Sequence, residues 1–226
     1  MGKELIRRLV DKIQLVVFDR NPVILKTVTK EWDVIVAATL EEVAECGVVI
    51  LAVPDKEIIG CMKLLNQIDR PVVVINVATN ITQASLEKIA ASHVRCISAK
   101  FIGHAGEMAL GLDPVIIIND NPPELATIAK QIFLFVGQIV VGTADLVCLV
   151  NTVAAEKAIK AAVDIEAILL KQGIIEDEII RGAIRQVAAG VIKAYADQEL
   201  GPFAREIVRR VCSSVKTVNE EKEEKT

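Results

Sequence analysis

Short runs of β-branched residues alternate with helical stretches between residues 13 and 141, and this alternation constrains the fold more than any other feature of the sequence. Seven runs are expected to be strands: 13–18, 34–36, 48–53, 72–76, 94–98, 115–118 and 138–141. Continuous Val/Ile runs that are separated by helices are typical of parallel strands buried on both faces. The pattern therefore predicts an α/β domain built from strand–helix–strand units over residues 1–142.

The pattern changes after Thr143, and the rest of the chain is predicted to be all-α over residues 143–215. Residues 144–172 are expected to form one long helix that Gly173 ends, because glycine readily adopts the conformation that closes a helix. Two further helices are expected over 176–197 and 202–214. Residues 216–226 are mostly charged and are expected to be a flexible tail.

The predicted long helix is rich in alanine, which allows another helix to approach closely. Its alanines include Ala154, Ala155, Ala158, Ala161 and Ala162. Three helices with this much apolar surface cannot hide it from water among themselves. We therefore expect a homodimer formed through the helical domain.

The composition excludes several classes of partner. The formal net charge is −4 and only 3% of the residues are aromatic, which argues against a surface that binds nucleic acid. The most apolar runs are too short to span a bilayer, and the amino-terminal segment is charged and has no apolar signal region. We expect a cytoplasmic protein that binds neither nucleic acid nor membranes.

The five cysteines give no sign of a disulfide framework or a metal site. Their number is odd and no C-x-x-C pair occurs, so neither zinc nor paired disulfides are indicated. No cluster of metal ligands is predicted elsewhere. Free cysteines are often small core residues, and this is the expected role of all five.

An acidic residue follows the first predicted strand. In a dinucleotide-binding fold, a carboxylate at this place accepts a hydrogen bond from the adenosine ribose and repels a 2′-phosphate, so Asp19 favours NAD. The neighbouring Arg20 could instead stack on adenine or bind the phosphate of NADP. Both residues also suit a simple turn before Asn21-Pro22.

The carboxyl ends of two further strands are candidate cofactor walls. Ligands of open α/β sheets bind at this end of the strands, which brings in Val53 and Pro54 after one strand and Ala78 and Thr79 after the next. We expect the nicotinamide to lie along these four residues.

Three polar residues are candidates for catalysis. Lys100 and His104 follow the predicted strand 94–98 and could protonate or orient a carbonyl or imine. The alternative is a surface lysine and a histidine that a neighbouring loop satisfies. Asn151 lies among apolar residues near the start of the long helix, where a polar group needs a partner or a substrate.

These segments together resemble the pyrroline-5-carboxylate reductases and, more loosely, the β-hydroxyacid and 6-phosphogluconate dehydrogenases. The similar segments are 1–9, 15–22, 39–54, 81–87 and 136–140, within a region that reaches from residue 1 to about residue 211. The resemblance implies a Rossmann-type domain, a helical dimerisation domain built on one long helix, and NAD or NADP as cofactor. It also implies hydride transfer to a C=N or C=O carbon of a small carboxylated substrate.

The chain departs from this family at its amino terminus. The family's first strand and G-x-G-x-x-G loop precede the helix that resembles residues 1–9, and no G-x-G-x-x-G occurs in this sequence. Because that loop holds the pyrophosphate, we expect cofactor binding to be weak or lost in the chain as written. The missing strand is central in the family, between the strands that match 13–18 and 48–53. Its absence leaves their main-chain groups unpaired unless the two strands close up.

Two other departures concern catalysis. The reductases' Pro-Asn-Thr-Pro segment is replaced by residues 99–104, which puts proline biosynthesis in doubt. At the position of the dehydrogenases' catalytic lysine this sequence has Val147, although Asn151 matches their asparagine.

The leading hypothesis is a dimeric NAD(P)-dependent oxidoreductase. The alternatives are a catalytically silent dimeric scaffold that has lost the cofactor, or a start codon misplaced within a longer reductase.

Overall fold

The computed structural model describes residues 1–223 and divides the chain into two compact units. The first unit is Met1–Val153, and the second begins at Ala154. The boundary therefore lies eleven residues beyond the expected one at 142/143, because the first turns of the long helix pack with the α/β unit.

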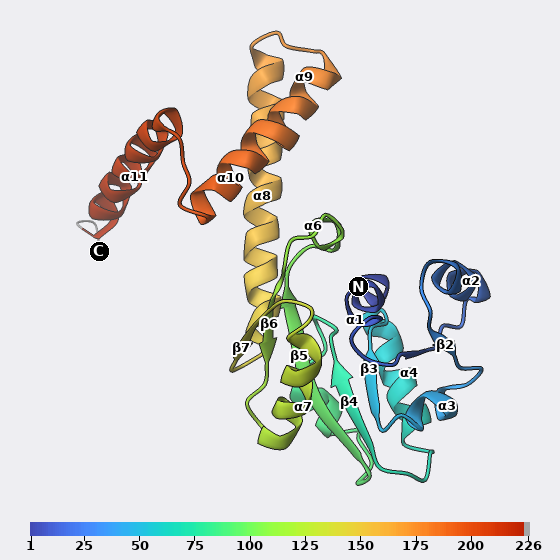
Figure 1. Cartoon of the computed structure of the whole chain (residues 1–226). Helices are drawn as coiled ribbons and strands as arrows, with labels where there is room; N and C mark the ends of the chain where they lie inside the picture. Colours follow the sequence, from blue (N-terminus) through green and yellow to red (C-terminus); the bar gives the residue numbers. More distant parts are fainter. Residues whose placement is uncertain (224–226) are drawn as a thin grey trace. The chain divides into compact units, whose positions relative to one another are not determined.

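The first unit alternates helices and strands, as the sequence predicts (Figure 1). Its strands are β1 Val16–Val17, β2 Ile35–Val36, β3 Val48–Leu51, β4 Val72–Asn76, β5 Val94–Ile102, β6 Val115–Ile118 and β7 Gln138–Val141. Its helices are α1 Gly2–Leu9, α2 Pro22–Glu31, α3 Leu40–Ala44, α4 Asp55–Leu65, α5 Gln83–Glu87, α6 Ala105–Ala109 and α7 Pro123–Phe133.

The strands form two separate sheets. One has five strands in the order β3-β4-β5-β6-β7, and the other consists of β1 and β2 alone. All pairs are parallel except β5 and β6, which run antiparallel with Ala99 opposite Ile118. The expected α/β class with a mainly parallel sheet is therefore confirmed, and one pair of strands is antiparallel.

The two sheets do not close up where the sequence suggested that a central strand is missing. Within the described residues, no main-chain hydrogen bond joins β1 to β3. The predicted strands 13–18 and 34–36 shrink to two residues each. Each of β1 and β2 has only one partner strand, so the main-chain groups along its other edge are not paired with a strand.

The five-stranded sheet packs between two apolar clusters, which we call core A and core B. Core A includes Leu5 and Leu9 of α1 and Phe133 of α7. Core B includes Ile58 and Met62 of α4. Side chains of successive strand residues point to opposite faces, so β3 sends Val49 and Leu51 into core B, while Val48 and Ile50 pack against core A.

Local capping groups fix where the early helices begin. The Asn21 side chain accepts a hydrogen bond from the Val23 N–H, so α2 begins with Pro22 as its first residue. The Thr39 hydroxyl accepts from the Glu42 N–H, and the Glu42 carboxylate accepts from the Ala38 N–H. The arrangement is close to a capping box, except that Glu42 binds the N–H of Ala38 and not that of the cap residue Thr39.

The second unit is helical. The helix α8 spans Leu146–Lys171 and therefore begins in the first unit, and Gly173 follows it with a φ of 83°. The predicted helix 176–197 is continuous but has a π-helical middle: α9 Asp177–Gly182, η1 Ala183–Ala188 and α10 Ala189–Ala196. The helix α11 covers Pro202–Glu223 and continues into the expected tail 216–226, whose last three residues lie outside the described part.

Most cysteines are not core residues, contrary to the expectation. Cys96 is buried, Cys61 and Cys148 are half-buried, and Cys46 and Cys212 are exposed. Burial raises the pKa of the Cys96 thiol from its ordinary 9.0 to about 12, with a smaller contribution from the Glu87 carboxylate. None of the helices in the described residues is both long and apolar enough to span a bilayer.

Candidate functional site

Lys100 is the most buried charged residue of the described structure. Its side chain is fully inaccessible, and its Nζ lies 2.5 Å from the Asp145 carboxylate and donates to the Thr79 carbonyl oxygen at 3.2 Å. Asp145 immediately precedes α8 and keeps 32% of its side chain exposed. The pair therefore joins the buried ammonium group of Lys100, on β5, to the partly exposed carboxylate of Asp145 at the start of α8.

A buried asparagine shapes the turn that presents the Thr79 carbonyl. Asn76, the last residue of β4, donates to the Ile81 carbonyl at 3.0 Å and accepts from the Ala78 N–H at 3.0 Å. The side chain of Asn76 is fully buried, so these bonds satisfy groups that water cannot reach. The turn after β4 is thereby held in the conformation in which Thr79 faces Lys100.

A second polar chain connects three elements at the same edge of the sheet. Asn80 donates to the Asp55 carboxylate at 2.6 Å and accepts from the Cys148 thiol at 3.3 Å. Asp55 begins α4, and Cys148 lies in the first turn of α8. The carboxyl ends of β3 and β4 and the beginning of α8 therefore meet here.

Asn151 joins α8 to β5 rather than standing free. Its Nδ2 donates to the Phe101 carbonyl oxygen at 2.9 Å, and the residue is half-buried. The strand β5 runs to Ile102, four residues beyond its expected end, so Lys100 lies within the strand and not after it. This extension is what brings Phe101 to the face of α8.

His104 lies outside this cluster, although it is only four residues from Lys100. It occupies the amino-terminal cap position of α6, is exposed, and makes no side-chain hydrogen bond in the described structure. Its ring lies over Gly106, where an added Cβ would come within 3.1 Å of it. The structure thus separates the two residues that the sequence suggested as alternative proton donors.

The residues proposed for the adenosine end, half-buried Asp19 and exposed Arg20, are engaged in local contacts. Asp19 accepts from the Asn21 N–H at 2.8 Å, the turn geometry that was the alternative to cofactor binding. The Arg20 guanidinium is paired with the Glu57 carboxylate of α4. Each keeps polar atoms that can still reach a ligand, because Arg20 is largely exposed and Asp19 is only half-buried.

The four residues proposed as nicotinamide walls differ in accessibility. Val53 and Thr79 are half-buried and Pro54 is exposed at the start of α4. Ala78 is only 6% exposed and packs in core B. The Ala78 side chain therefore contributes to the core beside the turn and is not accessible to a ligand.

Sequence reasoning missed the two residues that organise this edge, Asp145 and Asn76. Asp145 could have been noticed as a charged residue directly before a long apolar helix, where an acidic side chain is favourable. Asn76 is polar at the end of an otherwise apolar strand. Only the fold shows that Asp145 reaches a lysine 45 residues away in the sequence.

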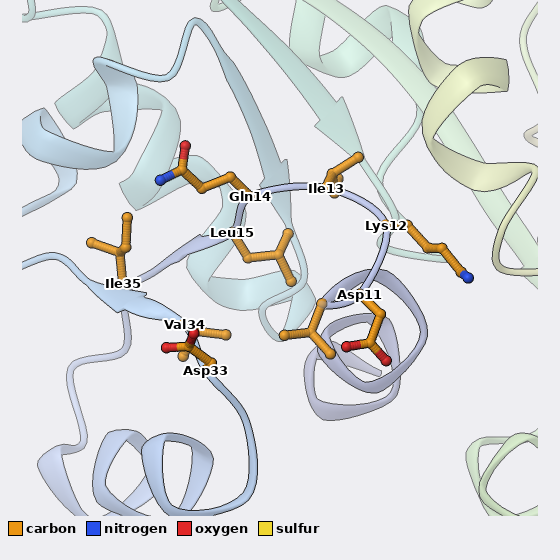
Figure 2. A pocket seen from close by; sticks show the side chains of 9 residues that line it. Asp11, Lys12, Ile13, Gln14, Leu15, Asp33, Val34 and Ile35 are labelled. Atoms are coloured by element: carbon orange, nitrogen blue, oxygen red, sulfur yellow. The ribbon is translucent and has the colours of Figure 1, made fainter.

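A shallow pocket of about 370 Å³ lies elsewhere (Figure 2). Residues 10–15 and 33–35 line it, with Asp11, Lys12 and Asp33 as its charged groups. It lies where β1 and β2 begin, whereas ligands of open α/β sheets bind where strands end. No group of three or more potential metal ligands comes together in the described residues.

No protein-family model matches the sequence, and no curated protein matches it. Several solved structures, however, match the fold of this chain. A pyrroline-5-carboxylate reductase from Coxiella burnetii matches 98% of this chain over 87% of its own, with a TM-score of 0.69 and 15% identity. The Plasmodium falciparum pyrroline carboxylate reductase with NADP bound gives the same coverages, a TM-score of 0.62 and 12% identity. The 3-hydroxyisobutyrate dehydrogenase of Mycobacterium tuberculosis matches 81% of this chain over 67% of its own, with a TM-score of 0.62 and 22% identity.

These similarities define the class of fold: an α/β domain of the Rossmann type followed by a helical region. More particularly, the fold is the one found in pyrroline-5-carboxylate reductases and related NAD(P)-dependent oxidoreductases. The resemblance inferred from the sequence is confirmed at the level of the fold.

Proposed function

We propose that this protein is an NAD(P)-dependent oxidoreductase that transfers hydride to a small imine or keto compound carrying a carboxylate. The observation that carries the proposal is the shared fold over almost the whole chain, combined with a polar cluster at the carboxyl ends of β4 and β5. This is the edge at which open α/β sheets bind their ligands.

The residues present fit the two ends of a dinucleotide better than its middle. Asp19 or Arg20 would hold the adenosine end, and Val53, Pro54 and the turn containing Thr79 would border the nicotinamide, which supplies the hydride when bound. The sequence has no G-x-G-x-x-G to cradle the pyrophosphate. We therefore expect NAD or NADP to bind weakly to the chain as written.

Of the two proton donors that the sequence suggested, His104 is the better candidate, although it lies outside the polar cluster. It is exposed and makes no competing hydrogen bond in the described structure, whereas Lys100 is buried and already bound to Asp145 and Thr79. In this proposal Lys100 is a positioning residue that fixes Asp145 and the β4 turn. Asn151 anchors the substrate with its side-chain carbonyl oxygen or with the second hydrogen of Nδ2, since one Nδ2 hydrogen is already donated to the Phe101 carbonyl oxygen.

Titration with NADH and NADPH tests this proposal directly. Binding is measured by calorimetry, and turnover is measured with a panel of cyclic imino acids and 2-keto acids. We expect weak binding, with Asp19→Ala weakening NADH further, and slow turnover that His104→Gln reduces while His93→Gln does not. Absence of binding by either nucleotide at millimolar concentration would refute the proposal for this chain.

The partner that we propose is a second copy of the chain, bound through the helical unit. Among residues 154–212, Ile180 is the only buried apolar residue, while large apolar side chains remain exposed along the helices. These exposed residues include Ile159 at 64%, Ile175 at 73%, Val187 at 65% and Phe203 at 77%. A unit with so small a core of its own gains its stability by covering this surface, and a symmetric dimer covers it on both copies at once.

A specific observation also supports the second candidate, a catalytically silent dimeric scaffold. The buried ammonium of Lys100 is already paired, and the sequence lacks the pyrophosphate loop. A scaffold of this kind would be folded and dimeric without nucleotide and would show no thermal shift with NADH or NADPH. Any hydride turnover by the chain would exclude it.

A further inference from the structure

The antiparallel strands β5 and β6 are connected by residues 103–114, which we call the His104 loop. The two strands pair with each other up to this loop, so its ends lie close together. Within the loop only Met108 and Pro114 are buried, and every other residue is exposed. Apolar packing therefore holds the loop at few points, although a group that delivers a proton must be held in one place.

A buried arginine of α1 holds the His104 loop by its polar groups. The Arg8 side chain is only 10% exposed. Its guanidinium donates to the carbonyl oxygens of Met108 at 3.3 Å and Leu112 at 2.7 Å, and to the Asp113 carboxylate at 2.5 Å. A fourth bond, of 2.8 Å, reaches the carbonyl oxygen of Val136, which lies shortly before β7. One side chain thus joins three points of the loop to α1 and to the start of β7.

The connection from Arg8 to His104 is a single helical turn. The helix α6 follows His104, and the Met108 N–H donates to the His104 carbonyl oxygen at 3.0 Å. The Met108 side chain packs in core A, and its carbonyl oxygen also accepts from Arg7 at 2.6 Å. The turn is therefore fixed by apolar packing on one side and by two guanidinium groups on the other. A shift of Met108 would move His104 with it.

Only a guanidinium group can make this set of bonds. It presents five N–H donors in a rigid plane, whereas a lysine ammonium carries three donors on one nitrogen. Arg8 makes its four bonds through the two terminal nitrogens, and its Nε–H is buried without a partner in the described residues. Because three of the four bonds end on a mostly exposed loop, they determine the geometry of the loop more than that of the core.

We propose that Arg8 is a positioning residue that fixes the His104 loop and thereby the place of the His104 imidazole. The inference rests on the proposed function, in which His104 delivers a proton to the substrate. Arg8 makes no hydrogen bond to the His104 side chain and acts through the Met108 carbonyl and α6. Without this anchor the sheet stays folded, and the imidazole moves among several positions.

The variant Arg8→Lys tests the proposal, because it keeps the positive charge and removes the planar set of donors. The sequence contains only two histidines, His93 and His104, so NMR of the carbon-bound ring hydrogens reports on both in one sample. The spectrum of His104→Gln assigns the two signals. In Arg8→Lys we expect the His104 signal to broaden and lose intensity, while the His93 signal stays sharp.

Turnover gives a second measurement. A displaced proton donor slows the chemical step and leaves nucleotide binding unchanged, so Arg8→Lys should lower kcat by about tenfold to a hundredfold with an unchanged KM for NADH. The matched control is Arg95→Lys, because Arg95 is also an arginine paired with a carboxylate, but is exposed and lies at the other end of β5. This control should change neither the His104 signal nor kcat.

A merely stabilising role of Arg8 predicts a different result. It would lower the melting temperature of Arg8→Lys and leave the His104 signal and kcat unchanged in the folded protein. A sharp His104 signal in folded Arg8→Lys would therefore overturn the proposal. Absence of turnover by the wild type would refute the proposed function, but the NMR measurement would still decide whether Arg8 fixes His104.

A milder variant decides the question if Arg8→Lys does not fold. Asp113 is 61% exposed and contributes one of the four acceptors, so Asp113→Ala removes one bond without opening the core. We expect the His104 signal to broaden in this variant as well, but less than in Arg8→Lys. An unchanged His104 signal in Asp113→Ala would refute the positioning role.

Discussion

The two partners of the Lys100–Asp145 ion pair are buried to different extents, so the loss of each should affect stability differently. The ammonium is fully buried, whereas the carboxylate keeps 32% of its side chain exposed. Removal of the carboxylate leaves a buried charge with only the Thr79 carbonyl as partner. Removal of the ammonium leaves an anion that water can still solvate.

We therefore predict that Asp145→Ala destabilises the protein more than Lys100→Met does. The expected losses in free energy of unfolding are about 3 kcal/mol and about 1 kcal/mol. The double variant should lose less than the sum of the two, because neither charge is then left alone. Urea denaturation of the three variants measures all of these values.

The matched control is the exposed pair Arg181–Asp177, whose side chains are 72% and 74% exposed. Arg181→Met should change the free energy of unfolding by less than about 0.5 kcal/mol. Equal losses for Asp145→Ala and Lys100→Met would contradict the asymmetry that we infer from burial.

Burial of Cys96 predicts an order of thiol reactivity. Its pKa is raised to about 12, so its reactive thiolate is scarce at pH 8, whereas Cys46 and Cys212 are exposed. Iodoacetamide should label Cys46 and Cys212 first, and Cys96 only after unfolding. Peptide mass spectrometry measures the order, and early labelling of Cys96 in the folded protein would count against its burial.

The raised pKa of Cys96 also predicts the direction in which the stability of the folded state changes with pH. The folded state holds the Cys96 proton more tightly than the unfolded state, whose thiol has the ordinary pKa of 9.0. The contribution of Cys96 to stability is thus complete below about pH 9 and is lost as the pH rises toward 12. In Cys96→Ala this part of the alkaline loss should be absent.

At the scale of the elements, the entry to β7 depends on a glycine that has no room for a side chain. A Cβ on Gly137 would lie 2.2 Å from the Pro114 carbonyl oxygen, which is itself bound to the Gln138 N–H. We predict that Gly137→Ala lowers the free energy of unfolding by about 3 kcal/mol or more, because β6 and β7 must move apart.

Gly142, at the other end of β7, is the control for this prediction. An added Cβ there meets nothing within 4 Å, and the residue has no positive φ. Gly142→Ala should therefore be nearly neutral in the same denaturation experiment. A similar loss in both variants would show that the strand tolerates no side chain for another reason.

The sequence predicted the elements well where burial alone determines them. The runs 72–76 and 115–118 became strands with the expected bounds, because each is a β-branched run largely buried in the sheet. The run 138–141 also kept its bounds, although β7 is an edge strand and is mostly exposed. The antiparallel direction of β6 could not be predicted, since a buried strand has the same composition in either direction. The length of β5 depends on its pairing with β6 beyond Ser98, which is a tertiary effect.

The site was predicted in part for the same reason. The sequence selected Lys100 and Asn151 because polar groups among apolar residues need partners, and both have partners in the structure. It did not identify those partners, which are 45 and 50 residues away along the chain. Their catalytic roles remain proposals.

At the scale of the whole molecule, the helical unit leads to a prediction about association. If a second copy covers its apolar surface, its melting temperature must rise with protein concentration. The variant Ile159→Glu with Val187→Glu, which changes two exposed apolar residues, should give a monomer in light scattering. Thr27→Glu with Thr29→Glu, on the exposed surface of α2, is the control for added charge.

The π-helical segment η1 affects the directions in which the side chains of α9 and α10 point relative to each other. A π-helix takes five residues where an α-helix takes four to close a hydrogen-bonded turn, so Ala183–Ala188 accommodates extra chain without breaking the rod. If the same residues wound as a uniform α-helix, every side chain of α10 would be turned by about 100° about the rod axis relative to α9, whereas deletion of one residue would restore uniform winding and keep the present directions. Tyr195, 60% exposed, would therefore keep its direction after such a deletion, so the bulge allows one more residue in the rod without turning the side chains that follow it.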